Sequence, residues 1–381
     1  MYEIVNPTKV IFGVDSLDIL GKKAAEYGKK AFVVSGKNFI ERTGLMNRIK
    51  VILNQNNLEY FIFNKIEPQP DMSVIEEGAF FLKENNCDLV IAIGGGSVID
   101  SGKGIALLAT NKGSCIDFLN SEKITNYPLP LIAIPTTAGT GSEVTKYLVF
   151  SDRKNNKKFT IKSEKVCPRL AIVDPELTLS LPKKLTIVTA IDSLVHCIEG
   201  YLNTKSNLYT KSLSLTSIKT IVTKLNALIK NPKNIQLRED IMFSSTIGGM
   251  VINNARTGII HTMSAAIEPY CNLYHGEVVG RILPKVLTFY IQQDKCKEEL
   301  INISEYVYGG KTNDPKLFIK KINNFILNLF GRDNFKDQNI SEDLIDGFIE
   351  RVLLDKGLPE ISPVDINSEN LQKIFKEILY I

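Results

Sequence analysis

Short apolar segments that end in turn residues recur through the first half of the chain, and they restrict its fold more than any other feature. They lie at residues 30–36, 60–63, 88–96 and 130–137, and the stretches 39–56 and 73–86 between them show helical spacing. Short uninterrupted apolar runs are typical of strands buried on both faces. Strand–helix alternation of this kind predicts a parallel sheet with helices on both faces, and such sheets bind ligands at the carboxyl ends of their strands.

The strand signal stops after a last apolar run at 170–175. Helical spacing then continues over 187–203, 209–230 and 237–254, with breaks expected near Pro232 and at Gly248 and Gly249. A chain of 381 residues is long enough for two domains. We therefore expect a Rossmann-like α/β domain over residues 1–181 and an all-α domain over residues 182–381.

The charge balance excludes several classes of partner. Lys and Arg total 46, Asp and Glu total 42, and the net charge of +4 is spread along the chain, so neither nucleic acid nor a membrane surface is expected as a partner. We expect neither a signal peptide nor a membrane span, which requires an apolar run of about 18 residues. The six cysteines form no CxxC pair, which favours reduced thiols in a cytoplasmic protein.

A glycine-rich loop follows the third expected strand. "IAIGGGSVIDSGKGIA" places Gly94, Gly95, Gly96 and Ser97 between a strand and a helix. Glycines let the backbone approach a phosphate closely, and the N–H groups at the start of the helix favour its negative charge. The spacing differs from GxGxxG because Ile99 occupies the place of the last glycine, and a tight turn without a ligand is the alternative interpretation.

A second loop of similar character follows the next expected strand. It reads "IPTTAGTGSEVT" and offers Thr136, Thr137, Thr140, Gly141 and Ser142. Hydroxyls and exposed amides here could hold a pyrophosphate or a ribose, although an ordinary Ser/Thr/Gly turn has the same composition. Because the two loops end neighbouring strands, together they favour a nucleotide site more strongly than either does alone.

The histidines of the helical half suggest a metal site. "TAIDSLVHCIEGY" puts Asp192 and His196 four residues apart on one helix face, and "GIIHTMSAAIEPYCNLYHGE" supplies His261 and His275, the other two of only three histidines. One carboxylate and three imidazoles suit iron(II) or zinc. An Asp–His hydrogen bond in a helical core is the alternative for the first pair. Glu199, one turn beyond His196, is either an orienting partner of a ligand or a solvated residue.

Several ordered motifs together resemble the iron-containing (group III) alcohol dehydrogenase family. In chain order they are "NPTKVIFG", "GGGSVID", "PTTAGTGSEVT", "VDPELTLSLP", "DSLVHCIEGY", "IIHTM" and "HGE". The resemblance implies an N-terminal dinucleotide-binding domain and a helical C-terminal domain with one metal. Its metal ligands fall on Asp192, His196, His261 and His275. Its cofactor loops fall on residues 94–97 and 136–142, with Asp100 and Lys158 as further cofactor residues.

The activity that this resemblance implies is that of a metal-dependent, NAD(P)H-linked alcohol dehydrogenase or aldehyde reductase. The metal, Fe²⁺ with Zn²⁺ as the alternative, polarises an aldehyde carbonyl or stabilises an alkoxide, while hydride passes between that carbon and the nicotinamide. The resemblance also implies a homodimer that acts on a small-molecule aldehyde or alcohol.

Two departures from the family pattern lie beside the third histidine ligand. Many members carry another histidine four residues later, where this chain has Ala265, so a proton must travel through water, a cofactor hydroxyl or another side chain. Upstream, "NNARTGIIH" places Arg256 where small or apolar residues are usual. Its planar guanidinium suits a carboxylate, phosphonate or sulfonate, as in phosphonoacetaldehyde-reductase-like members, but it could equally form a structural ion pair.

A third departure concerns the cofactor. NAD-using relatives commonly carry an Asp after the strand "AFVVS", where this chain has Gly36 followed by Lys37. Without that carboxylate nothing repels a 2′-phosphate, and Lys37 could attract it. We expect NADPH, with NADH as the alternative.

Other functions remain open from the sequence. The substrate class that we expect is an anionic aldehyde, such as a phosphonoacetaldehyde-like compound or a short semialdehyde. A neutral primary alcohol of the butanol or propanediol type is the alternative. A lyase of the dehydroquinate-synthase type would share the architecture. A non-catalytic metal- or nucleotide-binding protein is the remaining hypothesis, against which the intact set of four ligands argues.

Overall fold

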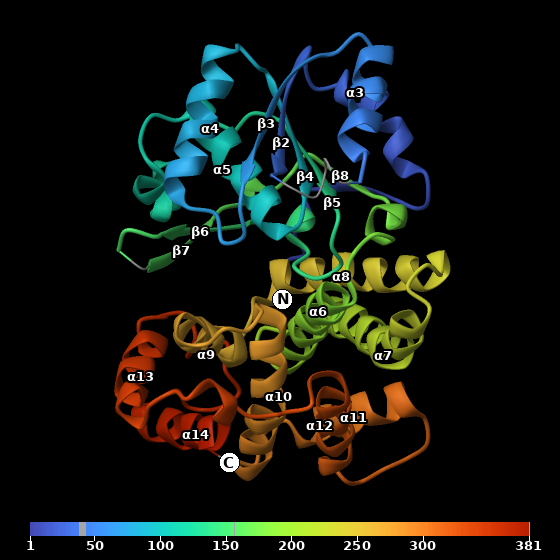
Figure 1. The fold of residues 1–381 in the computed structure, drawn as a ribbon. Coiled ribbons are helices and arrows are strands. Elements are labelled where there is room, and N and C mark those ends of the chain that lie inside the picture. Colours follow the sequence, from blue (N-terminus) through green and yellow to red (C-terminus); the bar gives the residue numbers. More distant parts are fainter. Residues whose placement is uncertain (38–42, 156, 381) are drawn as a thin grey trace. The chain divides into compact units, whose positions relative to one another are not determined.

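The computed structural model describes residues 1–37, 43–155 and 157–380, and one parallel sheet organises its first half (Figure 1). Its six strands pair in the order β1-β8-β5-β4-β2-β3, and every pairing is parallel. The strands are β1 (Lys9–Phe12), β2 (Lys30–Gly36), β3 (Glu59–Ile66), β4 (Leu89–Gly94), β5 (Leu131–Pro135) and β8 (Leu170–Val173). The predicted α/β class with a parallel sheet is confirmed, because the central runs of Val, Ile, Leu and Ala are buried on both faces.

The direction of strand addition reverses between β2 and β4. From β2 the chain continues outward to β3 and then crosses back over β2 to reach β4 and β5. Gly36 and Gly94, at the carboxyl ends of β2 and β4, therefore flank the point at which open parallel sheets bind ligands. Ser35 of β2 pairs directly with Ile93 of β4, so the ends of the two strands are level.

Helices cover both faces of this sheet. Figure 1 shows α3 (Leu45–Gln55) on one side and α4 (Met72–Glu84) and α5 (Gly96–Thr110) on the other. Val33 belongs to the apolar core under α3, whereas Val34 belongs to the core under α4 and α5. Successive residues of β2 thus point their side chains into the cores on opposite faces of the sheet, as the pleat of a strand requires.

Two shorter features complete the α/β part. A short helix, α1 (Leu20–Ala24), packs beside α3. An antiparallel hairpin is formed by β6 (Tyr147–Asp152) and β7 (Lys157–Lys162), two strands that the sequence did not predict.

The chain forms two compact units whose boundaries differ from the predicted ones. The α/β unit comprises Val5–Pro182 and Pro232–Asn253, and the helical unit comprises Met1–Ile4, Lys183–Asn231 and Asn254–Ile381. The boundary predicted between residues 181 and 182 lies one residue from the observed change of unit between Pro182 and Lys183. Residues 232–253, which the sequence analysis assigned to the helical domain, group with the α/β unit in this division.

That segment belongs to α8 (Ile235–Ala255), which also corrects a second prediction. The break expected near Pro232 is present, but the helix continues through Gly248 and Gly249. A Cβ atom on Gly249 would lie only 2.5 Å from the carbonyl oxygen of Gly141, so this glycine permits close backbone contact rather than ending the helix.

The helical unit contains the remaining helices. They are α6 (Lys183–Leu202), α7 (Leu208–Lys230), α9 (Ile259–Ile267), α10 (His275–Gln292), α11 (Lys297–Tyr308), α12 (Lys316–Phe330), α13 (Ile345–Leu353) and α14 (Ser368–Tyr380). Helix α6 is long and apolar enough to cross a membrane, but 89% of its most apolar stretch is buried, as expected of a core helix.

Candidate active site

Four predicted metal ligands lie together inside the helical unit. Asp192 and His196 are one turn apart on α6, His261 lies on α9, and His275 is the first residue of α10. Asp192 and His196 are buried, and the side chain of His275 is 37% exposed. One side of the cluster is therefore open while the other three ligands are enclosed.

The ligand atoms of Asp192, His261 and His275 all lie within 4.8 Å of one another, so these three side chains could hold one metal ion. Oδ1 of Asp192 lies 3.5 Å from Nε2 of His196, 3.4 Å from Nε2 of His261 and 3.4 Å from Nε2 of His275. Ligand atoms bound to one tetrahedral zinc or similar ion at about 2.1 Å are separated by roughly 3.4 Å. The rings of His196 and His261 are stacked with centroids 4.6 Å apart.

A glycine next to His275 makes this arrangement sterically feasible. A Cβ atom on Gly276 would lie 1.7 Å from the carbonyl oxygen of Val188, one turn before Asp192 on α6. The start of α10 therefore touches the backbone of α6, which brings His275 next to Asp192. The "HGE" motif thus combines a ligand with the residue that permits its approach.

Carboxylates orient two of the histidines from behind. Nδ1 of His261 lies 2.5 Å from Oε2 of Glu199, and Nδ1 of His275 is hydrogen-bonded to Glu268. Glu199 also accepts the N–H groups of Gly258 at 2.9 Å and Ile260 at 2.6 Å, so its position is fixed by the start of α9. Such partners set the tautomer and direct Nε2 to a metal. Glu199 was a sequence candidate; Glu268 was missed, because no helical spacing relates it to His275.

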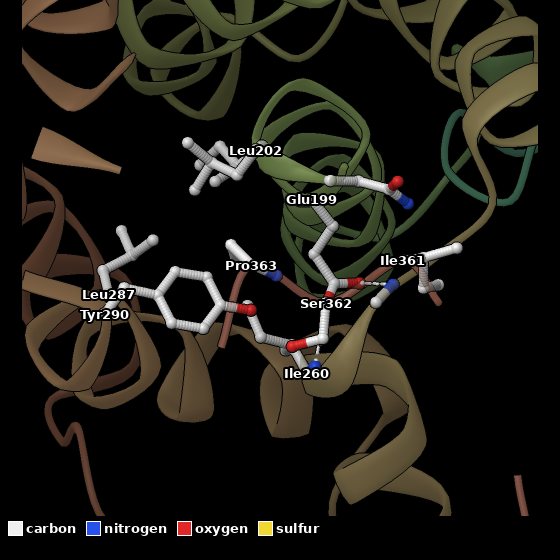
Figure 2. A pocket seen from close by; sticks show the side chains of 11 residues that line it. Glu199, Leu202, Ile260, Leu287, Tyr290, Ile361, Ser362 and Pro363 are labelled. Carbon is white, nitrogen blue, oxygen red and sulfur yellow. Dashed lines mark hydrogen bonds between the residues drawn. The ribbon is translucent and has the colours of Figure 1, made fainter. Parts of the chain in front are cut away.

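A small cavity of about 10 Å³ lies beside Glu199, which is space for about one water molecule (Figure 2). Tyr290 of α10 lines it together with the apolar side chains of Leu202 and Leu287. Burial raises the pKa of the Tyr290 hydroxyl well above its usual range. A neutral, largely apolar surrounding strengthens the Glu199–His261 interaction by lowering the local dielectric constant.

The ionisation of Asp192 and His196 suits metal binding. Burial lowers the pKa of His196 to about 4, so this imidazole is neutral near pH 7. Burial also acts to lower the pKa of His275, but Glu268 and Asp192 outweigh it and raise the pKa to about 10, so a metal ion would displace a proton from this imidazole. Burial opposes ionisation of Asp192, yet the surrounding imidazoles hold its pKa well below its usual range. An anionic ligand surrounded by nitrogen donors is the charge arrangement that a divalent cation requires.

The two predicted cofactor loops meet within the α/β unit. Strands β4 and β5 are neighbours, with Gly94 paired to Pro135. A Cβ atom on Gly95 would lie 3.2 Å from Oγ1 of Thr137, and one on Gly96 would lie 2.7 Å from Cγ2 of Thr140. Side chains at these glycines would fill the space between the loops, and α5 begins at Gly96. The glycines and the helix start fit a phosphate group.

Where the second loop meets α5, Lys103, Asp100 and Ser142 form a buried polar cluster that the sequence did not predict. The side chain of Lys103 is fully buried, and its Nζ donates to Oγ of Ser142 at 2.8 Å and to Oδ1 of Asp100 at 3.2 Å. Ser142 also donates to Asp100, and the other Asp100 oxygen accepts the N–H of Val149 at 3.1 Å. Asp100 and Ser142, expected to touch the cofactor, are thus engaged in holding the second loop against α5.

The other predicted cofactor residues lie at the surface or at strand ends. Thr136 is buried after β5, whereas Lys37 and Lys158 are exposed. Ser97 accepts the N–H of Gln69 at 3.3 Å. A Cβ atom at position 36 would meet the Ile66 carbonyl at 3.4 Å, an ordinary contact, so packing does not demand a glycine there.

Arg256 is engaged in an ion pair. Its Nη2 atom lies 2.5 Å from Oδ1 of Asp355, which also accepts the N–H of Gly357 at 3.2 Å. Arg256 has a φ of +69°, in the left-handed region that few non-glycine residues adopt. Of the two interpretations that the sequence left open, the structure favours the ion pair, since the guanidinium already has a carboxylate partner.

Models of two protein families match almost the whole chain. "Iron-containing alcohol dehydrogenase" matches residues 7–175, and "Fe-containing alcohol dehydrogenase family, C-terminal" matches residues 186–379. The chain belongs to the iron-containing alcohol dehydrogenase family. Members of this family act as NAD-linked alcohol dehydrogenases and aldehyde reductases, which places the chain among oxidoreductases rather than lyases.

Individual members of the iron-containing alcohol dehydrogenase family resemble the chain over nearly their full lengths. It is 33% identical over 349 residues to alcohol dehydrogenase 4 of Saccharomyces cerevisiae, covering 92% of this chain and 91% of the relative. The solved structure of a 1,3-propanediol oxidoreductase has a TM-score of 0.93 at 27% identity and 100% coverage of both chains. Sulfoacetaldehyde reductase from Bifidobacterium kashiwanohense, solved with NAD⁺, has a TM-score of 0.88 at 26% identity, covering 100% of this chain and 99% of that one.

Proposed function

We propose that the chain is an iron(II)-dependent aldehyde reductase and alcohol dehydrogenase that prefers NADPH, with zinc and NADH as the alternatives. The observation that carries this proposal is the placement of Asp192 Oδ1 within 3.5 Å of Nε2 of His196, His261 and His275. A carboxylate and three imidazoles gathered in this way are a ligand set that suits iron or zinc.

The residues of the chain would divide the work of the site. When bound, the metal polarises the carbonyl oxygen of an aldehyde and the reduced nicotinamide supplies hydride to its carbon. Asp192 and the three histidines hold the ion, and Glu199 keeps His261 in one orientation. Ala265, one turn after His261, is exposed and carries no titratable group, so we propose that water delivers the proton.

Two features support NADPH over NADH. The position at the end of β2 that would carry a ribose-binding carboxylate is Gly36, although packing would accommodate a side chain there. The following residue, Lys37, is exposed and cationic. Comparing kcat/KM for NADPH and NADH tests the preference, and an NADH advantage of about tenfold or more would overturn it.

A single set of assays tests the proposed reaction. The apoprotein is reconstituted with Fe²⁺ or Zn²⁺, and NAD(P)H oxidation is followed with neutral and anionic short aldehydes. His261→Ala should lose both metal retention and turnover, whereas Thr262→Ser, on the next residue of α9, should keep both. If His261→Ala retains stoichiometric metal and the wild-type rate, the metal assignment is wrong.

An anionic aldehyde is the first substrate class to test, and a neutral primary alcohol or its aldehyde is the second. The likeness to sulfoacetaldehyde reductase favours an anionic substrate, and the likeness to 1,3-propanediol oxidoreductase favours a neutral one. Arg256 would have to exchange Asp355 for the substrate anion. Arg256→Ala should raise KM for sulfoacetaldehyde but not for propanal. Asp355→Asn should free the guanidinium and therefore lower KM for sulfoacetaldehyde. Unchanged KM values in both variants would exclude Arg256 from substrate binding.

Assembly and location are further proposals. We propose a cytoplasmic homodimer without a nucleic-acid or membrane partner. The cysteines of the chain are free thiols, and four of them are buried, which supports a reducing compartment. Light scattering on the metal-loaded protein measures its molar mass in solution, and the mass of a monomer would overturn the proposed homodimer.

A further inference from the structure

A hollow lies between α3 and the strands β2 and β3, and its role as argued below rests on the proposed nicotinamide cofactor. The hollow measures about 510 Å³, the size of a small-ligand site. Ser35 contributes to it from β2, Ile62 from β3, and Met46, Asn47 and Lys50 from α3. It therefore lies on the α3 side of the sheet, next to the point where strand order reverses.

The charges and hydrogen-bond groups of this hollow suit an anion. Among the described residues, Lys50 is the one charged residue that lines the hollow, and it forms no ion pair with any of them. α3 begins at Leu45, after Gly44, which also lines the hollow, and a helix start favours negative charge. Arg48, on the same helix, is instead paired with Asp18 at 2.8 Å, so the two cations of α3 serve different partners.

A second, independent observation points to a bound group. The side chain of Ser35 is fully buried and lines the hollow, yet its hydroxyl has no hydrogen-bond partner among the described residues. An unpaired buried hydroxyl costs free energy, so such groups commonly mark a ligand or a water site. Its neighbours in the strand are apolar, which makes this single hydroxyl conspicuous within β2.

The position of the hollow identifies the ligand that would present an anion there. Ser35 is paired with Ile93, which directly precedes the Gly94–Gly96 loop that we assign to the cofactor phosphates. β3 lies two strands from β4, or roughly 10 Å at ordinary strand spacing. That is about the span from the pyrophosphate of a dinucleotide to the far side of its adenosine ribose.

We propose that Lys50 and Ser35 bind the 2′-phosphate of NADPH in this hollow. Lys50 supplies the charge, Ser35 donates a hydrogen bond to a phosphate oxygen, and the start of α3 adds its partial positive charge. Lys50 thereby becomes a specificity-determining residue, and it does so from a helix rather than from the residue that directly follows β2. NADH carries a 2′-hydroxyl in place of the phosphate and would form no ion pair with Lys50.

Binding measurements without turnover test this proposal. Dissociation constants of the metal-loaded full chain are measured by calorimetry for NADPH and NADH, and for adenosine 2′,5′-bisphosphate and 5′-AMP. Lys50→Gln should weaken NADPH and the bisphosphate by about tenfold or more while changing NADH and 5′-AMP less than about twofold. Ser35→Ala should weaken the same two ligands by about three- to tenfold.

Matched variants make the outcome decisive. Arg48→Gln removes a cation from the same helix two residues away and should leave the ratio of NADPH to NADH affinity unchanged. Lys37→Gln separates the proposed role of Lys50 from that of the residue after β2. Equal effects of Lys50→Gln on NADPH and NADH, or no effect on NADPH, would overturn the proposal.

The test also separates this proposal from the proposed function. If NADH binds and supports aldehyde reduction but the bisphosphate does not bind, the 2′-phosphate site is wrong and the reaction stands. If the bisphosphate binds through Lys50 but no aldehyde is reduced, the site stands and the proposed reaction is wrong.

Discussion

Oε2 of Glu199 lies 2.5 Å from Nδ1 of His261, and the same carboxylate accepts the N–H groups of Gly258 and Ile260 at the start of α9. One buried side chain of α6 therefore fixes both the helix that carries the third histidine and the ring orientation of that histidine. This contact allows the metal site to be tested without altering a ligand.

Glu199→Gln should weaken metal binding by about 10- to 100-fold while leaving the four ligands in place. The neutral amide cannot stabilise the imidazole as the carboxylate does, and it orients His261 less firmly. Competition with a chelator measures the affinity. Glu298→Gln, on an exposed residue of α11, controls for loss of one carboxylate. Wild-type affinity in Glu199→Gln would show that the contact does not tune the metal site.

Gly276→Ala should abolish metal binding, because its Cβ would lie 1.7 Å from the Val188 carbonyl oxygen and push α10 away from α6. The matched control is Gly347→Ala in α13, where no atom lies within 4 Å of the added Cβ. That control should be neutral or more stable by about 0.5–1 kcal/mol, since alanine is the better helix former. Metal content by atomic emission and unfolding in urea distinguish the two; full metal content in Gly276→Ala contradicts the steric account.

Lys103→Met should destabilise the α/β unit by about 3–5 kcal/mol, because it leaves the buried Asp100 carboxylate without its cation. Adding Asp100→Asn should restore part of that loss, since both charges are then removed together. Lys112→Met, on an exposed lysine just after α5, should change stability little. Urea unfolding followed by circular dichroism gives the three values. A double variant as unstable as the sum of its single variants would show that the two charges do not interact.

Glu143→Gln should become progressively more stable than the wild type as pH rises. Burial raises the pKa of Glu143, which accepts a hydrogen bond from Thr246 at 2.9 Å. The unfolded carboxyl loses its proton near pH 4.5, whereas the folded carboxyl keeps it to higher pH. Between these two values the folded state binds more protons, so its stability falls with increasing pH.

The measurement is urea unfolding of both proteins at intervals of about one unit between roughly pH 5 and pH 8. Glu164→Gln, on an exposed residue of the same unit, controls for the change in net charge. A stability difference that stays constant over this range would show that Glu143 titrates normally in the folded protein.

Much of the fold was readable from the sequence, because strand periodicity is local. The runs that became β2, β4, β5 and β8 are continuous apolar stretches, and their identity does not depend on distant residues. The two glycine loops and the Asp192–His196 pair were readable for the same reason. Joining that pair to His261 and His275 required ligand chemistry, since nothing local connects α6 with α9 and α10.

The features that the sequence did not reveal all depend on contacts between distant segments. Glu268 orients His275 through a short turn without periodicity, and Lys103 resembles any surface lysine until its helix is buried. Arg256 could be paired with Asp355 only once α13 and its following turn were placed. Gly249 reads as a helix breaker because glycine propensity is local, whereas its contact with Gly141 is not.

Because most of α8 belongs to the α/β unit, synthesis and division of this chain are both affected. Thr246 bonds to Glu143, Asn253 bonds to the N–H of Lys146, and Phe243 packs against Phe12 with ring centroids 5.2 Å apart. During synthesis the α/β unit therefore lacks part of its core until residue 253 has left the ribosome, after α6 and α7 have already emerged. A fragment that ends at Pro182 would expose Gly141, Glu143 and Phe12 to water, so the nucleotide-binding half cannot be excised there as a complete folding unit.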